Sequence, residues 1–360
     1  MLDASHLAAA GGGINMYLSS LIPQLSQDSE IDLELFYQFF RKKPELFQGI
    51  DSTKQHFMKF PSKLLNKLWI KTGTMDISKS YPNIEIFHGT HFSLPAFKTA
   101  KKVLHVYDAA YCKNPNLYNV AGQKMNEYGY NFLLKNNVHL ADHIISSSQN
   151  TSKDLQELFG INEEKISVIP ISIEKQPEVN PEFTQKVFDR YQIQKDSYIY
   201  YPAGTLEKRK NIHLLLKVFE KSGLDKKLLI SGVGERNFPT PHNVKFFRWS
   251  LIEERNAVYQ NAAYAIYPSL YEGFGIPIIE AMANNCPIAC SETTSVGEIS
   301  KDAALQFNPE DEKSILDAML QMESEDLRSK LRIQGQEKLK DYSWKNSISQ
   351  IKDVYKSILK

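Results

Sequence analysis

The chain has 360 residues, of which 42% are hydrophobic and 24% are charged, and its formal net charge is +1. This composition is typical of a soluble globular protein, and the length favours two domains of ordinary size. Because the net charge is close to zero, the charge of the whole chain gives no reason to expect nucleic acid as a partner.

The three cysteines are too few and too unevenly placed for a disulfide framework, so a reducing cytoplasm is the simplest interpretation. Cys286 and Cys290 lie four positions apart, but no second pair or nearby histidine completes a ligand set, and we expect no metal site. We find no run of 18 apolar residues and no signal-peptide pattern. The sequence therefore predicts neither a membrane span nor secretion by that route.

The chain opens with "MLDASHL", which leaves room for only a very short first strand unless the start is trimmed. Residues 41–79 then hold nine Lys or Arg against three acidic residues, with aromatic residues between them. Lys63, Lys67 and Lys71 recur on one face of an expected helix beside an apolar stripe. Such a helix suits an anionic membrane surface, but it equally suits a domain helix with its stripe in the core and its lysines in water.

Short apolar runs alternate with amphipathic runs along the rest of the chain. Apolar strands interleaved with helices are typical of parallel sheets that are covered on both faces. We therefore predict an α/β protein with two Rossmann-like domains, 1–172 and 173–341, divided where the polar, proline-bearing stretch 173–183 begins. The expected strands are 103–111, 143–148, 166–170, 198–205, 227–235, 244–249, 263–269 and 286–291, and the clearest helices are 210–223 and 253–262.

The stretch "PSLYEGFGIPIIEAMANN" (268–285) places Glu272 and Glu280 eight residues apart. Pro277 suits the first turn of a helix, and Gly275 lets the backbone turn sharply before it. The free N–H groups of such a turn suit an anion, whereas the carboxylates suit hydroxyl donors, including the diol of a sugar. Two sugars on either side of a diphosphate make a nucleotide sugar.

Positive charge for the diphosphate comes from "AGTLEKRKN" (203–211). Gly204 and Thr205 follow a strand, and Arg209 and Lys210 lie at the start of the next helix. A strand, a glycine turn and basic residues at a helix start form an anion site. Ligands of parallel α/β domains gather at the carboxyl ends of the strands, so we expect these residues near the glutamates.

These segments resemble the retaining glycosyltransferases of the large bacterial mannosyl- and glucosyltransferase family (family 4-like), which have two facing Rossmann domains (GT-B) and a Glu-x7-Glu motif. "PSLYEGFGIPIIEAMANNCP" matches the family pattern at most positions, with Asn285 where glycine is usual. The segments "AAAGGGINMYLSSLIPQL", "VYDAAY", "SSSQNTSKDL" and "YSW" also look like family segments. The resemblance implies that 1–172 is the acceptor-side domain and that 173–341 binds the nucleotide sugar. It also implies that 342–360 is a crossover helix that packs towards the first domain.

The resemblance implies a role for each motif residue. Glu280 would bind the ribose, Glu272 would contact the donor sugar near the reacting carbon, and Arg209 with Lys210 would neutralise the leaving diphosphate. The remaining implied site residues are Gly12, Gly13, Gly204, Thr205, Phe274 and Gly275 for donor binding, and Tyr107 and Asp108 near the reaction centre.

The first domain departs from the family pattern at one position. Tyr107 stands before Asp108 where the family usually has histidine, and tyrosine is a poor acid or base at neutral pH. His105, two residues earlier on the same side of a strand, is a candidate substitute. His88 and His91 are further pocket candidates, although a structural role suits any one of the three better.

The predicted enzyme moves a hexose from a nucleoside diphosphate sugar to a hydroxyl of a glycan or lipid-linked acceptor, in polysaccharide or glycolipid synthesis. Retention is implied by the resemblance. No Asp-x-Asp occurs, which fits a transferase without metal or other cofactor. Such a protein would work in the cytoplasm, with a peripheral contact to the inner face of the membrane through 41–79.

Other functions remain open from the sequence. A phosphorylase or epimerase would use the same architecture, and Tyr107 leaves room for a weakly active or inactive relative that binds nucleotide sugar or glycan as a partner subunit. "SGVGE" (231–235) alone gives little support to a dinucleotide-binding oxidoreductase, because GxGxxG is absent. The sequence does not identify the base, the sugar or the acceptor.

Overall fold

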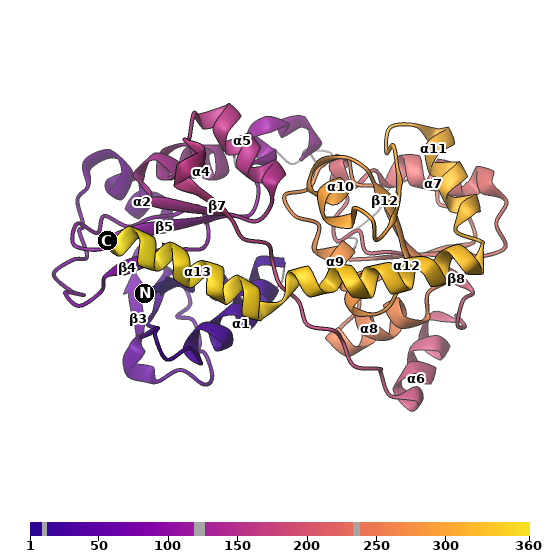
Figure 1. Cartoon of the computed structure of the whole chain (residues 1–360), viewed down its shortest axis with the longest axis horizontal. Coiled ribbons are helices and arrows are strands. Elements are labelled where there is room, and N and C mark those ends of the chain that lie inside the picture. The colour runs from indigo at the N-terminus through magenta and orange to yellow at the C-terminus, as the bar shows by residue number, and fades with distance from the viewer. Residues whose placement is uncertain (9–12, 119–126, 233–237) are drawn as a thin grey trace. The chain divides into compact units, whose positions relative to one another are not determined.

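The computed structural model describes residues 1–8, 13–118, 127–232 and 238–360, and the chain divides into two compact units. Unit 1 contains Met1–Lys113, Asn126–Ser172 and Trp344–Lys360, and unit 2 contains Asn114–Met125 and Ile173–Ser343. Each unit is a parallel sheet with helices, so the predicted pair of Rossmann-like domains is confirmed (Figure 1).

Unit 1 has a seven-stranded sheet in the order β3-β2-β1-β4-β5-β6-β7, and every pairing is parallel. The strands are β1 Leu2–Asp3, β2 Leu35–Phe39, β3 Gln55–Lys59, β4 Ile86–Gly89, β5 Lys101–Val106, β6 His143–Ser146 and β7 Ile166–Val168. The helices are α1 Gly13–Ser26, α2 Ser62–Thr72, α3 Ala110–Lys113, α4 Glu127–Leu140, α5 Gln149–Phe159 and α13 Trp344–Leu359, with 3₁₀ turns η1 Ser5–Ala8, η2 Ser52–Lys54 and η4 Glu163–Lys165. The strand order reverses direction between β1 and β4, which is the switch point of this sheet.

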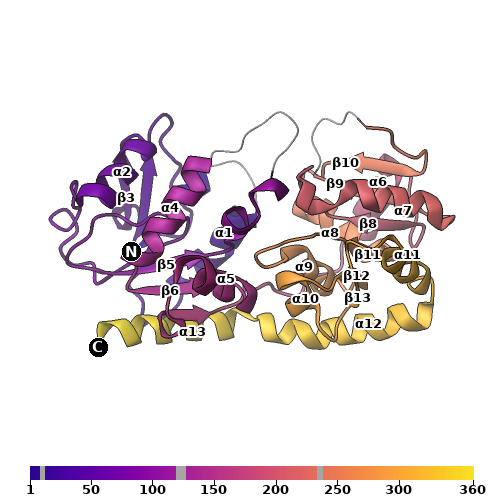
Figure 2. The same ribbon diagram turned by 90° about the horizontal axis from the view of Figure 1, so that it is seen from above.

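Unit 2 has a six-stranded parallel sheet in the order β10-β9-β8-β11-β12-β13, with its switch point between β8 and β11. The strands are β8 Tyr198–Tyr201, β9 Lys227–Ser231, β10 Val244–Phe247, β11 Tyr264–Tyr267, β12 Ile288–Ser291 and β13 Leu305–Phe307. The helices are α6 Pro181–Tyr191, α7 Ile212–Ser222, α8 Ile252–Asn261, α9 Ile276–Ala283, α10 Thr294–Ser300, α11 Glu312–Gln321 and α12 Glu325–Lys338, with 3₁₀ turns η3 Pro115–Leu117, η5 Lys208–Lys210 and η6 Leu339–Tyr342. Helices α9 and α10 pack beside β12 (Figure 2).

Buried tyrosines fix the central strand of unit 2. Tyr198, Tyr200 and Tyr201 of β8 have no exposed surface. A buried phenol needs a hydrogen-bond partner, and the hydroxyls of Tyr198 and Tyr200 find one at 2.7 Å, on Val258 O and Ser231 Oγ respectively. The Tyr201 hydroxyl donates to the carbonyl of Lys210. The last of these bonds ties the basic loop directly to the core of the sheet.

The division of the chain differs in one place from the expected domains. The boundary after Ser172 lies where the composition placed it, but residues 114–125, expected within 1–172, group with unit 2. In the described part of this segment, the ring of Tyr118 lies 5.2 Å from the guanidinium carbon of Arg209. The sequence does not reveal this cation–π contact, because its two residues lie 91 positions apart.

Two other expected bounds need correction. The expected strand 103–111 ends at Val106, and α3 begins at Ala110, because the chain leaves the sheet through the loop that holds Asp108. The expected last segment 342–360 becomes a helix only from Trp344, since residues Leu339–Tyr342 form a 3₁₀ turn that belongs to unit 2.

Helix α13 belongs to unit 1 and packs against α1 (Figure 1). Its buried residues are Trp344, Ser347, Ile348, Ile351 and Val354. This three-to-four-residue spacing makes one apolar stripe. On its other side Lys352 Nζ lies 2.9 Å from Asp28 Oδ2, and Lys356 Nζ lies 3.1 Å from Glu30 Oε1. We expect the stripe to contribute most of the stabilisation, because ion pairs at the surface contribute little.

We expect Ile351→Ala to lower the free energy of unfolding by about 2–5 kcal/mol, since it leaves a cavity where the side chain has no exposed surface. Ile333→Ala is the matched control on α12, because Ile333 is 73% exposed, and it should change the free energy by less than about 0.5 kcal/mol. Urea denaturation measures both. Equal losses in the two variants would contradict the docking of α13 by its apolar stripe.

Candidate functional site

The loops that follow β8 and β9 meet backbone to backbone. Gly204 has φ +76° and its N–H donates to the carbonyl of Ser231 at 3.0 Å. A Cβ on Gly232 would lie 2.7 Å from the Cα of Gly204, so no larger residue fits there without a shift of the backbone. Thr205 is exposed beside this contact. The sequence analysis selected Gly204 but not Gly232. The position of Gly232 directly after an apolar strand could have identified it.

Arg209, Lys210 and Glu272 come together at the switch point of unit 2. The two basic residues lie in η5 after β8, and Glu272 lies in the loop after β11. Lys210 Nζ is 2.7 Å from Glu272 Oε1, and Arg209 Nη1 is 2.6 Å from Glu272 Oε2. The hydroxyl of Tyr267 also donates to Oε1 at 2.9 Å. The predicted proximity of the basic pair and the first glutamate is therefore present in the structure.

The cluster is largely excluded from water, and its charges shift one another's protonation. Burial would raise the pKa of Glu272, but the charges of Arg209 and Lys210 outweigh it and lower the pKa to about 2. Burial and the neighbouring Arg209 lower the pKa of Lys210 to about 8. Glu272 is therefore ionised at neutral pH, whereas Lys210 begins to lose its proton just above neutral pH.

Main-chain contacts hold the two loops together. The N–H of Leu270 donates to the carbonyl of Arg209 at 2.7 Å, and Ser295 Oγ donates to the carbonyl of Glu272 at 2.7 Å.

Gly275 has φ +99°, a conformation that side-chain-bearing residues rarely adopt. Phe274 is buried and meets the ring of Tyr342 edge-on at 6.0 Å. Helix α9 then starts at Ile276, one residue before the expected Pro277.

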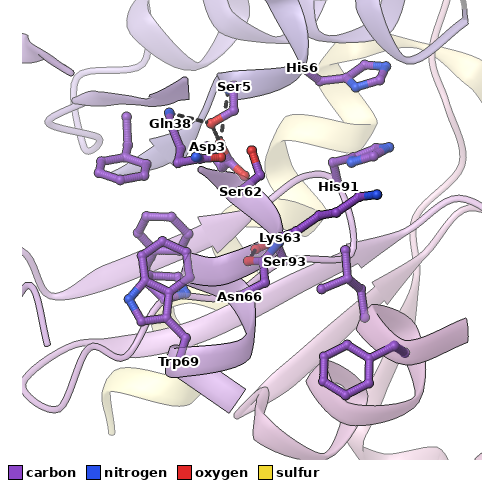
Figure 3. A pocket seen from close by; sticks show the side chains of 15 residues that line it. Asp3, Ser5, His6, Gln38, Ser62, Lys63, Asn66, Trp69, His91 and Ser93 are labelled. Atoms are coloured by element: carbon purple, nitrogen blue, oxygen red, sulfur yellow. Dashed lines mark hydrogen bonds between the residues drawn. The ribbon is translucent and has the colours of Figure 1, made fainter. Parts of the chain in front are cut away.

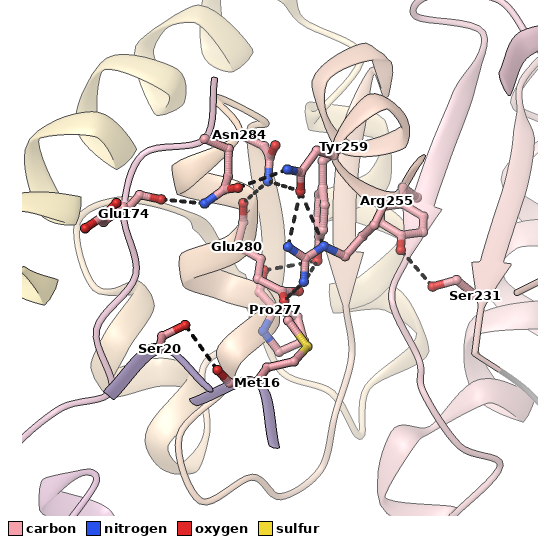
Figure 4. A network of polar contacts seen from close by, with 12 residues as sticks. Met16, Ser20, Glu174, Ser231, Arg255, Tyr259, Pro277, Glu280 and Asn284 are labelled. Atoms are coloured by element: carbon pink, nitrogen blue, oxygen red, sulfur yellow. Dashed lines mark hydrogen bonds and ion pairs between the residues drawn. The ribbon is translucent and has the colours of Figure 1, made fainter. Parts of the chain in front are cut away.

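Glu280 lies on α9 and is 6% exposed. It forms an ion pair with Arg255 of α8, and the hydroxyl of Tyr259 donates to its Oε2 at 3.2 Å (Figure 4). The Arg255 guanidinium also lies 5.7 Å from the ring of Trp249. Each carboxylate oxygen has two acceptor sites, so these contacts leave Glu280 capacity for a ligand hydroxyl.

Sequence reasoning missed Arg255 and Tyr259. Their spacing of four places them on one face of the expected helix 253–262, which was the available signal. The sequence did not show that this face meets α9, because that contact depends on how two helices pack on the sheet.

The first-domain candidates lie in unit 1. Tyr107 is 6% exposed, its hydroxyl has no partner among the described residues, and burial raises its pKa. Asp108 is half-buried at the end of β5, and its Oδ1 accepts from the N–H of Ala110 at 3.2 Å. Gly13 is the exposed first residue of α1, and Gly12 lies outside the described residues.

The three candidate histidines have different environments. His105 has no exposed surface, stacks on Tyr107 at 4.5 Å, and burial lowers its pKa to about 3. His88 is buried and hydrogen-bonded to the hydroxyl of Tyr355 at 2.7 Å. His91 lines a pocket of unit 1 with His6, which stacks on it at 4.3 Å. A structural role therefore fits His88, whereas neither ring nitrogen of His105 has a hydrogen-bond partner among the described residues, and His91 lines a pocket (Figure 3).

The basic segment 41–79 contains α2, whose apolar stripe turns inward. Leu65 and Trp69 are buried in the core of unit 1, whereas Lys63, Lys67 and Lys71 are exposed. The domain-helix interpretation therefore accounts for the stripe. Leu64 remains 50% exposed beside the lysines.

The described residues lack two features that bear on function. No helix there is both long enough and apolar enough to cross a membrane. In the same parts of the chain, no three His, Cys, Asp or Glu side chains are grouped so as to hold a metal ion.

Comparison with known proteins gives matches in both halves of the chain. The family model for glycosyltransferase family 4 matches residues 11–176, and the model for glycosyl transferases group 1 matches residues 183–338. The O-antigen chain mannosyltransferase RfbU of Salmonella typhimurium is 25% identical over 341 residues, which cover 90% of each chain. The O-antigen chain mannosyltransferase B of Escherichia coli is 27% identical over 289 residues, or 75% of this chain and 74% of that protein.

Solved structures with the same fold include sucrose-phosphate synthase from Thermosynechococcus elongatus, with a TM-score of 0.73 and 16% identity over 99% of this chain and 98% of that one. HepE of Anabaena in complex with UDP-glucose has a TM-score of 0.73 and 13% identity over the same shares. At these identities the likeness shows the GT-B fold alone. The two family matches span most of the sequence, and the chain belongs to the glycosyltransferases, with a family 4 first half and a group 1 second half.

Proposed function

We propose that this glycosyltransferase moves a hexose from a nucleoside diphosphate sugar to a hydroxyl of a glycan or lipid-linked acceptor in cell-surface polysaccharide synthesis. The buried cluster of Arg209, Lys210 and Glu272 at the switch point of unit 2 carries this proposal. The names of RfbU and the Escherichia coli relative support a polysaccharide product and make mannose the first sugar to test.

In the proposed mechanism the donor diphosphate binds Arg209 and Lys210, which stabilise the charge that develops as it leaves. Glu272 accepts a hydroxyl of the donor sugar, and Glu280 accepts the ribose hydroxyls. The departing phosphate oxygen takes the acceptor's proton on the same face, so the sugar keeps its anomeric configuration. The cations supply the charge stabilisation that a divalent ion supplies elsewhere, and we propose that the reaction needs neither metal nor other cofactor.

The free protein holds this site in a self-paired state, because Glu272 pairs with both cations and Glu207 Oε2 also lies 2.6 Å from Arg209 Nε. Incoming phosphate oxygens therefore compete with the carboxylate for Arg209 and Lys210. Once the phosphates hold the cations, Glu272 is free to accept a sugar hydroxyl. Glu272 thus pairs with the cations while the site is empty and accepts a sugar hydroxyl once the donor is bound.

The alternative is an inactive relative that binds nucleotide sugar or glycan as a partner subunit. The burial of Tyr107, where the family usually has histidine, favours it. Donor binding without transfer and without slow donor hydrolysis would support this alternative.

The proposed location is the cytoplasm at the inner face of the membrane. The three cysteines are unpaired, as suits a reducing compartment. The exposed lysines of α2, together with the exposed Leu64, support a peripheral contact with anionic lipid.

Glu272→Gln should lower transfer, or slow donor hydrolysis, by more than about tenfold, since a charge-assisted hydrogen bond to the sugar is worth about 1.5–3 kcal/mol. Affinity for the nucleoside diphosphate should change less than turnover does, because two effects oppose each other: glutamine no longer competes for the cations, but it also no longer helps to keep Lys210 protonated. Released diphosphate from GDP-mannose and UDP-glucose measures turnover, and calorimetry measures affinity. The exposed Glu253→Gln is the control. Unchanged turnover in Glu272→Gln would remove Glu272 from the reaction.

Lys210→Ala should weaken binding of GDP or UDP by roughly tenfold or more at pH 7, since a buried cation that contacts the phosphate is lost. Wild-type affinity should fall as the pH rises from about 7 to about 9, because Lys210, with a pKa of about 8, loses its charge there. The variant should show a flatter profile. Lys208→Ala is the control, since Lys208 is exposed in the same turn. Identical profiles in the two variants would rule out Lys210 as the phosphate ligand.

The double variant Lys67→Gln with Lys71→Gln should reduce retention on phosphatidylglycerol-containing vesicles by roughly thirtyfold, at about 1 kcal/mol per surface lysine. Lys301→Gln with Lys330→Gln removes the same charge from unit 2 and should have little effect. Sedimentation with vesicles measures both. Equal retention of the two double variants would leave α2 as an ordinary domain helix.

A further inference from the structure

Tyr118 is a buried aromatic residue beside the cations of unit 2. It ends the 3₁₀ turn η3, where its N–H donates to the carbonyl of Pro115 at 3.2 Å. Residues 114–116 at the start of the turn are exposed, whereas Tyr118 is only 8% exposed. The turn packs against η5, which contains Arg209 and Lys210. An otherwise exposed turn therefore inserts one ring beside the cluster of Arg209, Lys210 and Glu272.

Arg209 has partners of two kinds. Its Nε donates to Glu207 Oε2 at 2.6 Å, and its Nη1 pairs with Glu272 Oε2 at 2.6 Å. Its guanidinium carbon lies over the ring of Tyr118, 5.2 Å from the centroid. The carboxylates occupy hydrogen-bond donors of the guanidinium, whereas the ring face occupies none. A phosphate oxygen that approaches these donors therefore competes with the carboxylates and not with Tyr118.

The proposed exchange of partners removes one restraint from Arg209. When Glu272 turns to a sugar hydroxyl, Glu207 still holds Nε, but a single hydrogen bond lets the end of a long side chain turn about it. A side chain that is mobile when its ligand arrives loses more conformational entropy on binding. The ring of Tyr118 restrains the guanidinium from another direction, and η3 holds the ring.

We propose that Tyr118 is a positioning residue of the donor site, whose ring holds Arg209 in place while the diphosphate replaces the Glu272 carboxylate. Arginine suits this arrangement, because a guanidinium packs on an aromatic face while it makes hydrogen bonds in its own plane. The Arg209 side chain is 15% exposed, and a cation–π contact is stronger where the cation is shielded from water.

The inference rests on the proposed function, because it concerns the cation that binds the diphosphate there. It also extends the donor site beyond the predicted second domain, 173–341. Tyr118 lies in the segment Asn114–Met125, which the sequence alone placed in the first domain and which belongs to unit 2.

Calorimetry with GDP and UDP on the full chain tests the proposal. Tyr118→Leu should weaken binding by roughly threefold to thirtyfold, which is the range of a cation–π contact. Tyr118→Phe keeps the ring and should bind within about twofold of wild type. Asn116→Ala is the control, since Asn116 is exposed in the same turn, and it should bind as wild type does.

A double-mutant cycle separates positioning from a general effect on the fold. Because Tyr118 acts through Arg209 in this proposal, Tyr118→Leu should have little further effect on affinity in an Arg209→Ala chain. A ring that only stabilised the fold would weaken binding by the same factor with and without Arg209. Thermal unfolding of each chain shows that it is folded before its affinity is compared.

Equal or tighter binding by Tyr118→Leu would overturn the proposal, and so would a loss that is the same with and without Arg209. A loss in Tyr118→Phe as large as that in Tyr118→Leu would assign the effect to the hydroxyl and overturn it as well. Binding that depends on Arg209 but not on Tyr118 sinks this inference and leaves the proposed function standing. A wild-type chain that binds neither GDP nor UDP sinks both.

Discussion

The candidate site depends on the Glu272 carboxylate, which lies between the positive charges of Arg209 and Lys210 out of water, with Glu207 as a second carboxylate on Arg209. Taking Arg209 and Lys210 out of water has a high cost in free energy, and Glu272 offsets it by pairing with both. A buried cation left without a partner would destabilise the loop or lose its proton, as the lowered pKa of Lys210 already indicates. The carboxylate therefore keeps an anion site charged and in position while no anion is bound. Binding then becomes an exchange of partners rather than the burial of new charge.

The fold provides this exchange with a rigid support. The loops after β8 and β11 leave adjacent strands at the switch point, and hydrogen bonds from Tyr201 and Leu270 fix the main chain at Lys210 and Arg209. Tyr267 joins the strand to the carboxylate itself. Because the charges sit on a braced backbone, the distances between them do not depend on the rest of the loop. Such preorganisation is what electrostatic stabilisation of a leaving group requires.

The sequence predicted the site residues whose proximity follows from the order of strands and loops along the chain. Parallel strands bring their carboxyl ends together, so the positions of Arg209, Lys210 and Glu272 after two apolar strands predicted their proximity. It was uninformative where a contact depends on packing: Arg255 meets Glu280 only because α8 presents that face to α9. Strands β2 to β4 were not predicted, because they lie among charged and aromatic residues, whereas the very short first strand that "MLDASHL" allows is β1, with two residues. The ring of Tyr118 contacts Arg209 of unit 2, and no local sequence pattern predicts that contact.

The two switch points differ in chemistry in a way that matches two kinds of substrate. That of unit 2 is lined by buried, opposed charges, which suit the diphosphate and diols of a donor. That of unit 1, a pocket of about 310 Å³, combines aromatic rings with the Asp3 carboxylate, the amides of Gln38 and Asn66 and the Lys63 ammonium, so its net charge is close to zero. A diphosphate bound there would face Asp3, while a neutral sugar bound in unit 2 would leave Arg209 and Lys210 paired with Glu272 and gain little from them. Charge therefore favours an anionic ligand at the switch point of unit 2 and an uncharged ligand in the pocket of unit 1.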